Sequence, residues 1–326
     1  MNRLLYKRNL RVSRINEEAR TDPQALIARE EARFDEDVSQ YAAALAEQRG
    51  RQLVLLAGPS SSGKTTTAHF LCDKLHALGR GAHVVSLDNF YRGRGLAPRL
   101  ANGEFNYEAL EALDLTRLQA CMASILETGG ARLPVYDFIA GRATGEDALQ
   151  TGPDSVVLFE GIHAINPLFE QHLPMEYVHK IFVSTATPFY EGKEKVLARR
   201  DNRLMRRLLR DMRFRGSGVE ETLDMWKQVA NGERENIFPY VDTCEATLDT
   251  TYAYEPCVYA HELLPALRAV QGASRHGEVV RRLTDILAQF APLPAALVPE
   301  NSLLREFLGA DGTESGPAHG TDGGMG

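Results

Sequence analysis

One stretch constrains this chain more than any other: residues 53–71, LVLLAGPSSSGKTTTAHFL. An apolar run stops at Gly58, small residues follow, and Lys64 opens a predicted helix over 64–78. Residues 58–65 match G-x-x-x-x-G-K-[ST] at every defined position. Small residues let the backbone curl so that successive N–H groups point inward, and the positive end of the following helix also attracts an anion. The stretch therefore predicts a loop that binds the phosphates of a nucleoside triphosphate.

We expect Lys64 to reach the β- and γ-phosphates and the Thr65 hydroxyl to bind Mg²⁺. The residues expected to bind ATP are Gly58, Pro59, Ser60, Ser61, Ser62, Gly63, Lys64, Thr65 and Thr66. The plainer alternative is a glycine–serine loop that happens to precede a helix. The sequence has no N-K-x-D guanine-reading motif, which speaks against a GTPase.

Short hydrophobic strands alternate with helices along the chain. The strands are predicted at 51–58, 81–88, 154–161, 179–185 and 245–250, and the helices at 15–49, 64–78, 115–126, 195–214, 220–230, 258–271 and 277–290. Residues 92–106 read as a loop over a site, and 131–144 as an extended stretch with a turn. The alternation predicts an α/β protein, a P-loop NTPase with a mostly parallel sheet covered by helices on both faces. Such sheets bind ligands at the carboxyl ends of their strands.

Asp88 falls directly after the second predicted strand. A carboxylate there would face the γ-phosphate, where phosphoryl transfer needs a base or an orienting group for the attacking hydroxyl. The alternative interpretation is an aspartate that caps a helix or a turn.

Composition excludes several classes of protein. The net charge of −7 over 326 residues argues against general coating of nucleic acid. The sequence shows neither an apolar run of membrane-spanning length nor a signal-peptide core, and its four cysteines are scattered without metal-ligand spacing. We expect a cytoplasmic protein with no membrane partner, and the sequence leaves a homo-oligomer open.

Six segments, in this order and spacing, resemble the uridine kinase and phosphoribulokinase family: GPSSSGKTT, SLDNFY, NGEFNYEALEALD, PVYDF, VVLFEGI and RRLLRDMRFRG. DNFY and PVYDF are closest to the uridine–cytidine kinases. In the second half, RDMRFRG, GERENIFPY and NSLLREFLG are similar to a bacterial branch of nucleoside kinases. The resemblance covers about residues 50–256. It implies transfer of a phosphoryl group from ATP to a nucleoside, with Mg²⁺.

The resemblance also implies roles for individual residues. Asp88 corresponds to the base toward the ribose 5′-hydroxyl, and Glu160 to the acidic residue near the magnesium ion, so the expected metal set is Thr65, Asp88 and Glu160. The expected substrate-binding residues are Tyr91, Tyr107, Glu108, Tyr136, Phe138, Arg142 and Ile162. The plainer alternatives are a strand-end carboxylate satisfied by backbone for Glu160 and ordinary core positions for the aromatic residues.

The chain departs from the family in the substrate positions. Glu108 stands where the family has an aspartate that holds the ribose diol. A histidine that meets the pyrimidine edge falls on Gly141, and a pocket glutamine falls near Met225. A site without these hydrogen-bond partners loses the discrimination that they supply. We therefore expect weak selection among bases.

The predicted helix at 195–214 carries Arg199, Arg203, Arg207 and Arg210 along one stripe. A solvated basic face or a nucleic-acid patch is the alternative interpretation. The resemblance places the family's lid here, and Arg207, Arg210 and Arg215 match arginines that clamp the phosphates. With Lys64 and Asp88, Arg207 and Arg210 make up the expected catalytic set.

These observations favour an ATP:nucleoside 5′-phosphotransferase. The alternatives are a kinase of another small alcohol, such as a sugar or sugar phosphate, and a nucleotide-binding regulatory or RNA-associated protein. We expect a helical extension over 1–50, a kinase domain over 51–256 with its lid at about 195–216, C-terminal helices over 257–310 packed on that domain, and a disordered tail over 311–326.

Overall fold

The computed structural model describes residues 8–99, 103 and 105–309. Contacts divide the chain into two compact units. Within the described residues, unit 1 comprises 32–186 and 228–250, and unit 2 comprises 8–31, 187–227 and 251–309. Helices α2 (Pro23–Ala46) and α6 (Val219–Asn236) contribute residues to both. The domain boundaries expected from sequence stay predictions, and the expected tail lies outside the described residues.

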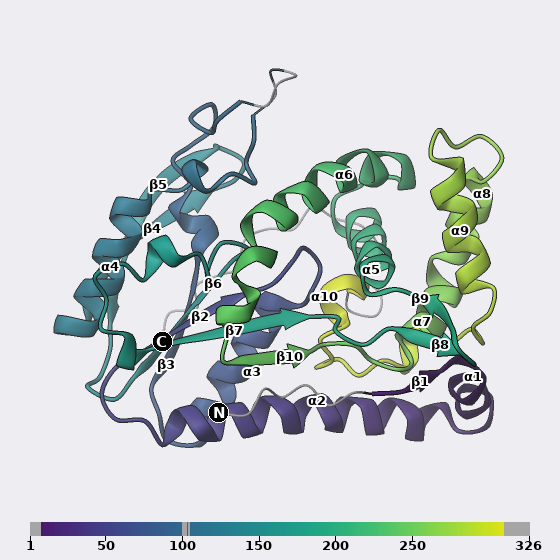
Figure 1. Cartoon of the computed structure of the whole chain (residues 1–326), viewed down its shortest axis with the longest axis horizontal. Helices are drawn as coiled ribbons and strands as arrows, with labels where there is room; N and C mark the ends of the chain where they lie inside the picture. Colours follow the sequence, from purple (N-terminus) through teal and green to yellow (C-terminus); the bar gives the residue numbers. More distant parts are fainter. Residues whose placement is uncertain (1–7, 100–102, 104, 310–326) are drawn as a thin grey trace. The chain divides into compact units, whose positions relative to one another are not determined.

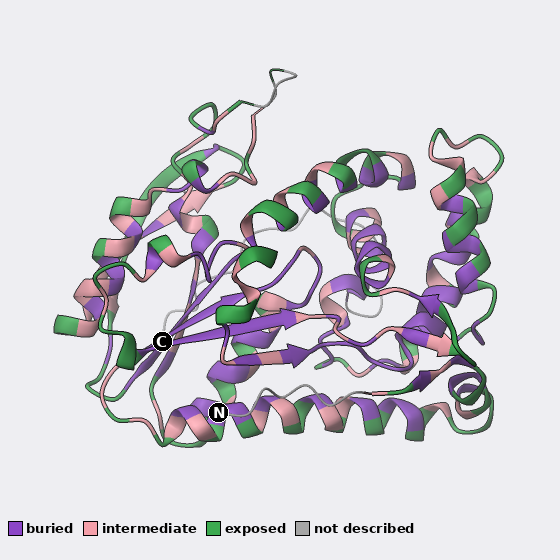
Figure 2. Cartoon of the chain, viewed as in Figure 1, coloured by how far each residue is buried: buried purple, intermediate pink, exposed green. Residues whose placement is uncertain are grey.

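Unit 1 is built on a five-stranded parallel sheet in the order β10-β7-β2-β6-β3 (Figure 1). Its strands are β2 (Gln52–Ala57), β3 (Ala82–Ser86), β6 (Val156–Glu160), β7 (Val178–Ser184) and β10 (Ala246–Asp249). β2 and β6 are buried along their whole length, as the colouring in Figure 2 shows. Strands covered on both faces read as continuous apolar runs, which is why the sequence reveals them.

Two helices cover the sheet. The side chains of Leu53 and Leu55 in β2 join one core cluster with α4 (Leu115–Thr128), which contributes Leu118 and Ile125. α3 (Lys64–Ala77) packs against β2, β3, β6 and β7, and its buried residues lie outside that cluster. Because successive side chains of a strand point to opposite faces, both faces are covered. The predicted α/β fold with a parallel sheet is confirmed.

An antiparallel hairpin of β4 (Gly130–Asp137) and β5 (Arg142–Gln150) packs beside α4. It matches the extended stretch with a turn expected at 131–144. β5 is almost entirely exposed. The hairpin carries Tyr136 at its tip end, so it brings an aromatic side chain to the edge of unit 1 where β3 ends.

Unit 2 contains a small sheet of β1 (Leu10–Arg11), β8 (Phe189–Glu191) and β9 (Glu194–Leu197). Its helices are α1 (Val12–Thr21), α5 (Arg199–Phe214), α7 (Glu255–Glu262), α8 (Leu264–Val270), α9 (Gly277–Leu287) and α10 (Arg305–Leu308). The prediction of a helix from residue 195 was wrong at its start, because 194–197 pairs with β8 and α5 begins at Arg199. β8 and β9 form a short hairpin across two residues, and a strand of four residues is too short to show a periodicity that distinguishes it from the start of a helix.

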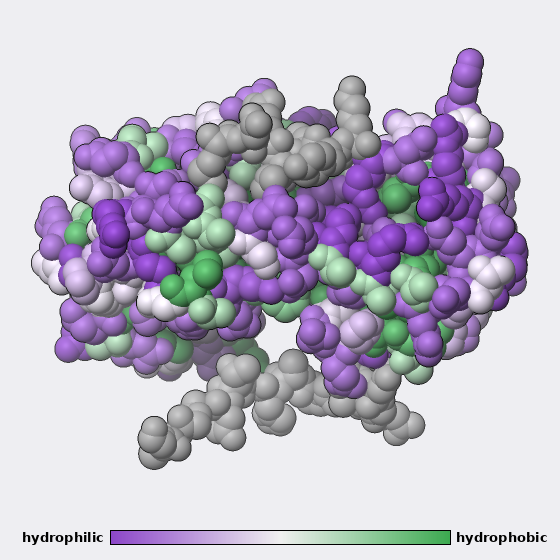
Figure 3. Space-filling model, turned by 90° about the horizontal axis from the view of Figure 1, so that it is seen from below, coloured by the Kyte–Doolittle hydropathy of each residue, from purple (hydrophilic) through white to green (hydrophobic). Residues whose placement is uncertain are grey.

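Within the described part of the chain, none of the helices combines the length and the apolar composition that a membrane span needs. On the face that Figure 3 shows, hydrophobic residues lie in small groups between hydrophilic ones.

Candidate active site

The predicted phosphate loop follows β2 and leads into α3, as the sequence indicates. Gly58 lies so close to β7 that a Cβ atom would stand 2.1 Å from the Val183 carbonyl oxygen, so only glycine fits. Ser61 has φ 59° and Gly63 has φ 85°, and these left-handed residues curl the loop onto the start of the helix. The Thr250 hydroxyl donates to the Ser62 carbonyl oxygen at 2.7 Å and fixes the loop from β10's end.

The side chains of the loop are placed for a nucleotide bound at the helix terminus. Lys64 is half-buried and its Nζ lies 3.5 Å from the Pro59 carbonyl oxygen, so the ammonium group reaches back over the loop. Thr65 is exposed in the first turn of α3. The narrow turn at Gly58, the curled backbone and the helix terminus together fit a triphosphate.

Asp88 lies in the 3₁₀ turn η1 (Leu87–Phe90), not directly at the strand end, because β3 ends at Ser86. Ser86 caps this turn, and its Oγ accepts a hydrogen bond from the Asp88 N–H at 3.4 Å. The Asp88 side chain is exposed at the surface of the unit, yet surrounding protein desolvates it and raises the pKa of its carboxyl, while the Lys64 charge opposes this. The carboxylate therefore lies within electrostatic reach of the phosphate loop.

Glu160 is the last residue of β6 and is only 5% exposed. The sheet register sets it beside Leu56 of β2 and Ser86 of β3, at the edge where the loop begins. Thr65, Asp88 and Glu160 supply one hydroxyl and two carboxylates, the oxygen ligands that Mg²⁺ takes together with phosphates and water. Among the described residues no group of three or more His, Cys, Asp and Glu could hold a metal alone. The donor set fits a shared Mg²⁺ better than an all-protein cage.

A pocket of about 270 Å³ lies beside these groups in unit 1. Its lining comprises four aromatic residues, one cation and one glycine: Tyr91, Tyr107, Tyr136, Phe138, Arg94 and Gly141. The ring centroids of Tyr91 and Tyr136 are 5.8 Å apart, and those of Tyr136 and Phe138 are 5.1 Å apart. Phe138 is 60% exposed, so this wall of the pocket is open to solvent and is not ordinary core.

Two carboxylates act on Tyr91, which lines this pocket. Burial raises the pKa of the Tyr91 hydroxyl strongly, and the charges of Asp88 and Glu108 raise it further. Asp88 therefore interacts electrostatically both with Tyr91 of the pocket and with Lys64 of the phosphate loop. A base for phosphoryl transfer has to lie near both the acceptor and the phosphates.

The sequence did not single out Arg94, which lines this pocket. Gly141 has φ 65°, its carbonyl accepts the Arg94 N–H at 2.6 Å, and a Cβ at 141 would stand 2.8 Å from the Arg94 Cβ. The absence of a histidine at 141 thus has a physical reason, because Arg94 fills that space. The composition of the glycine- and arginine-rich loop does not say which of its arginines lines the pocket.

Three predicted substrate positions are not among the lining residues of this pocket. Glu108 is half-buried, Arg142 is exposed at the start of β5, and Ile162 packs half-buried against the core of unit 1. Met225, where the family has a pocket glutamine, is 40% exposed in unit 2. Their predicted roles stay predictions.

The predicted lid arginines converge on one carboxylate within unit 2. Asp211 is fully buried and lies 3.1 Å from the Arg207 Nε, 3.5 Å from the Arg210 Nε and 3.2 Å from an Arg215 terminal nitrogen. Burial and the Arg215 charge lower the pKa of the Arg210 guanidinium, which Asp211 partly offsets. Three cations held around one anion carry an excess of positive charge that suits a polyphosphate.

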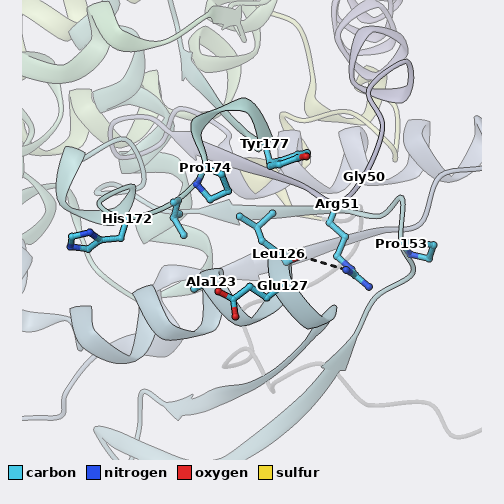
Figure 4. A pocket seen from close by; sticks show the side chains of 10 residues that line it. Gly50, Arg51, Ala123, Leu126, Glu127, Pro153, His172, Pro174 and Tyr177 are labelled. Carbon is cyan, nitrogen blue, oxygen red and sulfur yellow. Dashed lines mark hydrogen bonds between the residues drawn. The ribbon is translucent and has the colours of Figure 1, made fainter.

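A second pocket in unit 1, of about 330 Å³, lies at the opposite edge of the sheet (Figure 4). Arg51, at the start of β2, and Leu126, in the last turn of α4, contribute to its wall, and the Arg51 guanidinium donates to the Leu126 carbonyl oxygen at 3.4 Å. The phosphate loop follows the other end of β2, so this pocket is not part of the site described above.

A phosphate-binding loop at the carboxyl edge of a parallel sheet, with carboxylates and a small pocket beside it, belongs to the P-loop kinases, which move the terminal phosphoryl group of a nucleotide. Residues 53–251 match the model of the Phosphoribulokinase / Uridine kinase family. This match spans more than half of the chain, and the chain belongs to that family.

Two curated relatives illustrate the likeness. A uridine kinase of Lactobacillus johnsonii is 28% identical over 184 residues, which cover 55% of this chain and 77% of the relative. A uridine kinase of Deinococcus deserti is 30% identical over 171 residues, covering 52% and 73%. A solved structure of D-glycerate 3-kinase from Cryptococcus neoformans superimposes with a TM-score of 0.46 at 16% identity, covering 64% of this chain and 89% of that one.

Proposed function

We propose that this protein transfers the γ-phosphoryl group of ATP to the 5′-hydroxyl of a ribonucleoside, in the manner of uridine kinases. One observation carries the proposal: the charge of Asp88 interacts both with Lys64 of the phosphate loop and with Tyr91, which lines an aromatic pocket of about 270 Å³. Aromatic rings stack on a nucleobase without regard to its hydrogen-bonding edge. The names of the curated relatives support the same acceptor. A cytoplasmic location belongs to this proposal.

The residues suggest how the transfer runs. Asp88 accepts the proton of the 5′-hydroxyl, whose oxygen bonds to the γ-phosphorus while the bond to the ADP oxygen breaks. Lys64 and the loop N–H groups hold the phosphates. The resemblance to the family assigns to Arg207 and Arg210 the neutralisation of charge on the transferred group. A bound Mg²⁺, held by Thr65, Asp88 and Glu160, would neutralise the phosphate oxygens. These roles are part of the proposal.

Glu108 gives the proposal a substrate preference. Its charge acts on the hydroxyl of Tyr91, which lines the pocket, so we propose that it accepts hydrogen bonds from the ribose 2′- and 3′-hydroxyls. A buried acceptor that loses its donor costs about 1–3 kcal/mol, and half-buried Glu108 should cost less, so a ribonucleoside should be favoured over its 2′-deoxy form. Gly141 has no side chain to meet a base edge, so discrimination among bases should be weak.

Arg94 favours a second candidate. A guanidinium in the pocket wall binds a phosphate or carboxylate as readily as a base carbonyl, which would suit a sugar phosphate. The RNA-associated alternative has less support, because Arg203, Arg206 and Arg207 of α5 are buried and so do not form a solvated basic face.

A screen of ADP release with Mg-ATP tests the proposal. The acceptors are uridine, cytidine, adenosine, 2′-deoxyuridine, a sugar alcohol and a sugar phosphate. We expect turnover with the ribonucleosides, a smaller kcat/KM with deoxyuridine, and loss of turnover in Lys64→Ala and Thr65→Ala. Turnover with the sugar phosphate alone would establish the second candidate, and turnover with none of the acceptors would reject both.

A further inference from the structure

The last turn of α6 contacts both halves of the candidate site within unit 1. Three of its residues, Gly232, Glu233 and Asn236, make these contacts, and we call residues 232–236 the α6 bridge. Nothing in the sequence motif of the phosphate loop or in the aromatic pattern of the pocket indicates such a connection.

Glu233 holds the phosphate loop. Its Oε1 accepts a hydrogen bond from the Ser60 N–H at 2.9 Å, and its side chain is buried, with the residue only 3% exposed. Ser60 is the third residue of the loop, directly after the tight passage at Gly58 and Pro59. A buried carboxylate that accepts a backbone N–H makes a charge-assisted hydrogen bond, which is shorter and stronger than a neutral one. Glu233 therefore fixes the path of the loop before it curls around the phosphates.

Gly232 and Asn236 hold Glu108. The Asn236 Nδ2 donates to the Glu108 carbonyl oxygen at 3.1 Å and to the Gly232 carbonyl oxygen at 3.0 Å. A Cβ atom at Gly232 would stand 2.9 Å from the Glu108 Cβ and 3.4 Å from its Cγ. The close approach of α6 to the Glu108 side chain requires glycine at 232, although glycine in a helix interior is destabilising relative to alanine.

We propose that the α6 bridge sets the position of the acceptor-binding carboxylate Glu108 relative to the phosphate loop. Gly232 and Asn236 are positioning residues for Glu108, and Glu233 is the positioning residue for the loop. The inference rests on the proposed function, because it gives Glu108 the ribose as its ligand. A helix that contacts both Glu108 and the phosphate loop keeps the acceptor oxygen at attack distance from the phosphate. A misplacement of about 1 Å at this distance costs on the order of 100-fold in rate.

The first test is Gly232→Ala. The added methyl group displaces Glu108, so kcat/KM for uridine should fall by roughly 10- to 100-fold, and the preference for uridine over deoxyuridine should approach one. The KM for ATP should stay within about threefold, because the loop keeps its contact with Glu233. Gly277→Ala is the matched control, since Gly277 lies in helix α9 where an added methyl group would meet nothing within 4 Å, and it should leave both substrates unchanged.

Asn236→Ala is a second variant in case Gly232→Ala fails to fold, because it removes the hydrogen bond to the Glu108 carbonyl oxygen without adding volume. It should lower the preference for uridine over deoxyuridine in the same direction as Gly232→Ala. Thermal unfolding of all the variants shows whether each is folded.

The second test compares Glu233→Ala with Glu233→Gln. The alanine variant should lower kcat for uridine and deoxyuridine alike, because it moves the loop and leaves Glu108 in place. The glutamine variant should keep most of the activity, since its amide oxygen still accepts the Ser60 N–H. Equal loss in both variants would mean that the charge of Glu233 acts directly, and would overturn its positioning role.

An unchanged ratio of uridine to deoxyuridine in folded Gly232→Ala and Asn236→Ala would reject the role of the bridge at Glu108. This failure is distinct from failure of the proposed function, which would appear as inactivity of the unaltered protein with every nucleoside.

Discussion

The chemistry of single residues in this site depends on the groups around them. Asp88 is an ordinary carboxyl in sequence, but surrounding protein raises its pKa and Lys64 moderates the shift. A base works best when its pKa approaches the pH at which the enzyme operates, so a raised value improves Asp88 as a proton acceptor. Its charge interacts with Lys64 of the phosphate loop and with Tyr91 of the pocket.

At this scale we predict that Asp88→Asn keeps ATP binding and loses at least ~100-fold in kcat, the lower range for a positioned general base. In the unaltered protein kcat/KM should fall as the pH drops through the Asp88 pKa, because the protonated carboxyl cannot accept a proton. Titration calorimetry measures ATP binding to the variant, and a pH profile of kcat/KM measures the second effect. Full turnover in Asp88→Asn would show that another group is the base, and Glu160 would be the next candidate.

At the scale of the element, α5 carries buried ion pairs as well as buried apolar side chains. The Arg206 guanidinium lies 2.8 Å from the Glu255 carboxylate of α7, and both side chains are fully buried. Tyr259 donates to the same carboxylate at 2.6 Å, so the pair is supported by further hydrogen bonds. One turn along, Asp211 neutralises part of the charge of the three predicted lid arginines. The helix is therefore sensitive to loss of either acid.

We predict that Asp211→Asn destabilises unit 2 by about 3–5 kcal/mol, because it leaves buried guanidinium groups without their anion. Trp226, the single tryptophan of the chain, lies in unit 2 with its ring 5.5 Å from the Arg203 guanidinium, so its fluorescence follows urea unfolding of this helix region. Asp201→Asn on the same helix is the control. It pairs with Arg282, which is 45% exposed, and should cost about 1 kcal/mol or less. A similar shift for both variants would contradict the prediction.

At the scale of the whole molecule, a polar network ties distant parts of unit 1 together at the amino-terminal edge of its sheet. The Glu245 carboxylate, before β10, accepts from the Tyr41 hydroxyl of α2 and lies 3.0 Å from the His179 Nδ1 of β7. The other ring nitrogen of His179 lies 3.1 Å from the Gln52 Oε1 of β2. Burial alone would raise the pKa of Glu245, but the hydrogen bonds from His179 and Tyr41 lower it on balance.

A carboxyl whose pKa is lowered on folding stabilises the protein above its unfolded pKa of about 4.3, and this contribution is lost as the pH falls through the folded value. Glu245→Gln should therefore lower the free energy of unfolding at pH 7 by about 1.5–3 kcal/mol, the range for hydrogen bonds to a charged group. The difference from the unaltered protein should shrink as the pH falls from about 5 to 3. Circular dichroism at a series of pH values measures it. Glu176→Gln, at an exposed position, should show no effect, and a pH-independent difference for Glu245→Gln would exclude the linkage.

The sequence by itself determined the parallel sheet and the phosphate loop. These features depend on contiguous residues: fully apolar strands and a glycine-rich turn with Gly58 and Gly63. Local sterics and burial act on residues that are neighbours in the chain, so their effects are visible as patterns of residue type along the sequence.

Only the tertiary structure decided which side chains meet. The contact between Gly232 and Glu108 joins residues that are distant in sequence. The three arginines around Asp211 are close to it in sequence, but their convergence depends on the directions in which the side chains point. Glu233 and Ser60 are separated by 173 positions, and no periodicity relates them. A hydrogen bond of this kind exists only because the packing of α6 within unit 1 brings the carboxylate to the loop, and packing depends on the whole set of buried side chains rather than on any one segment.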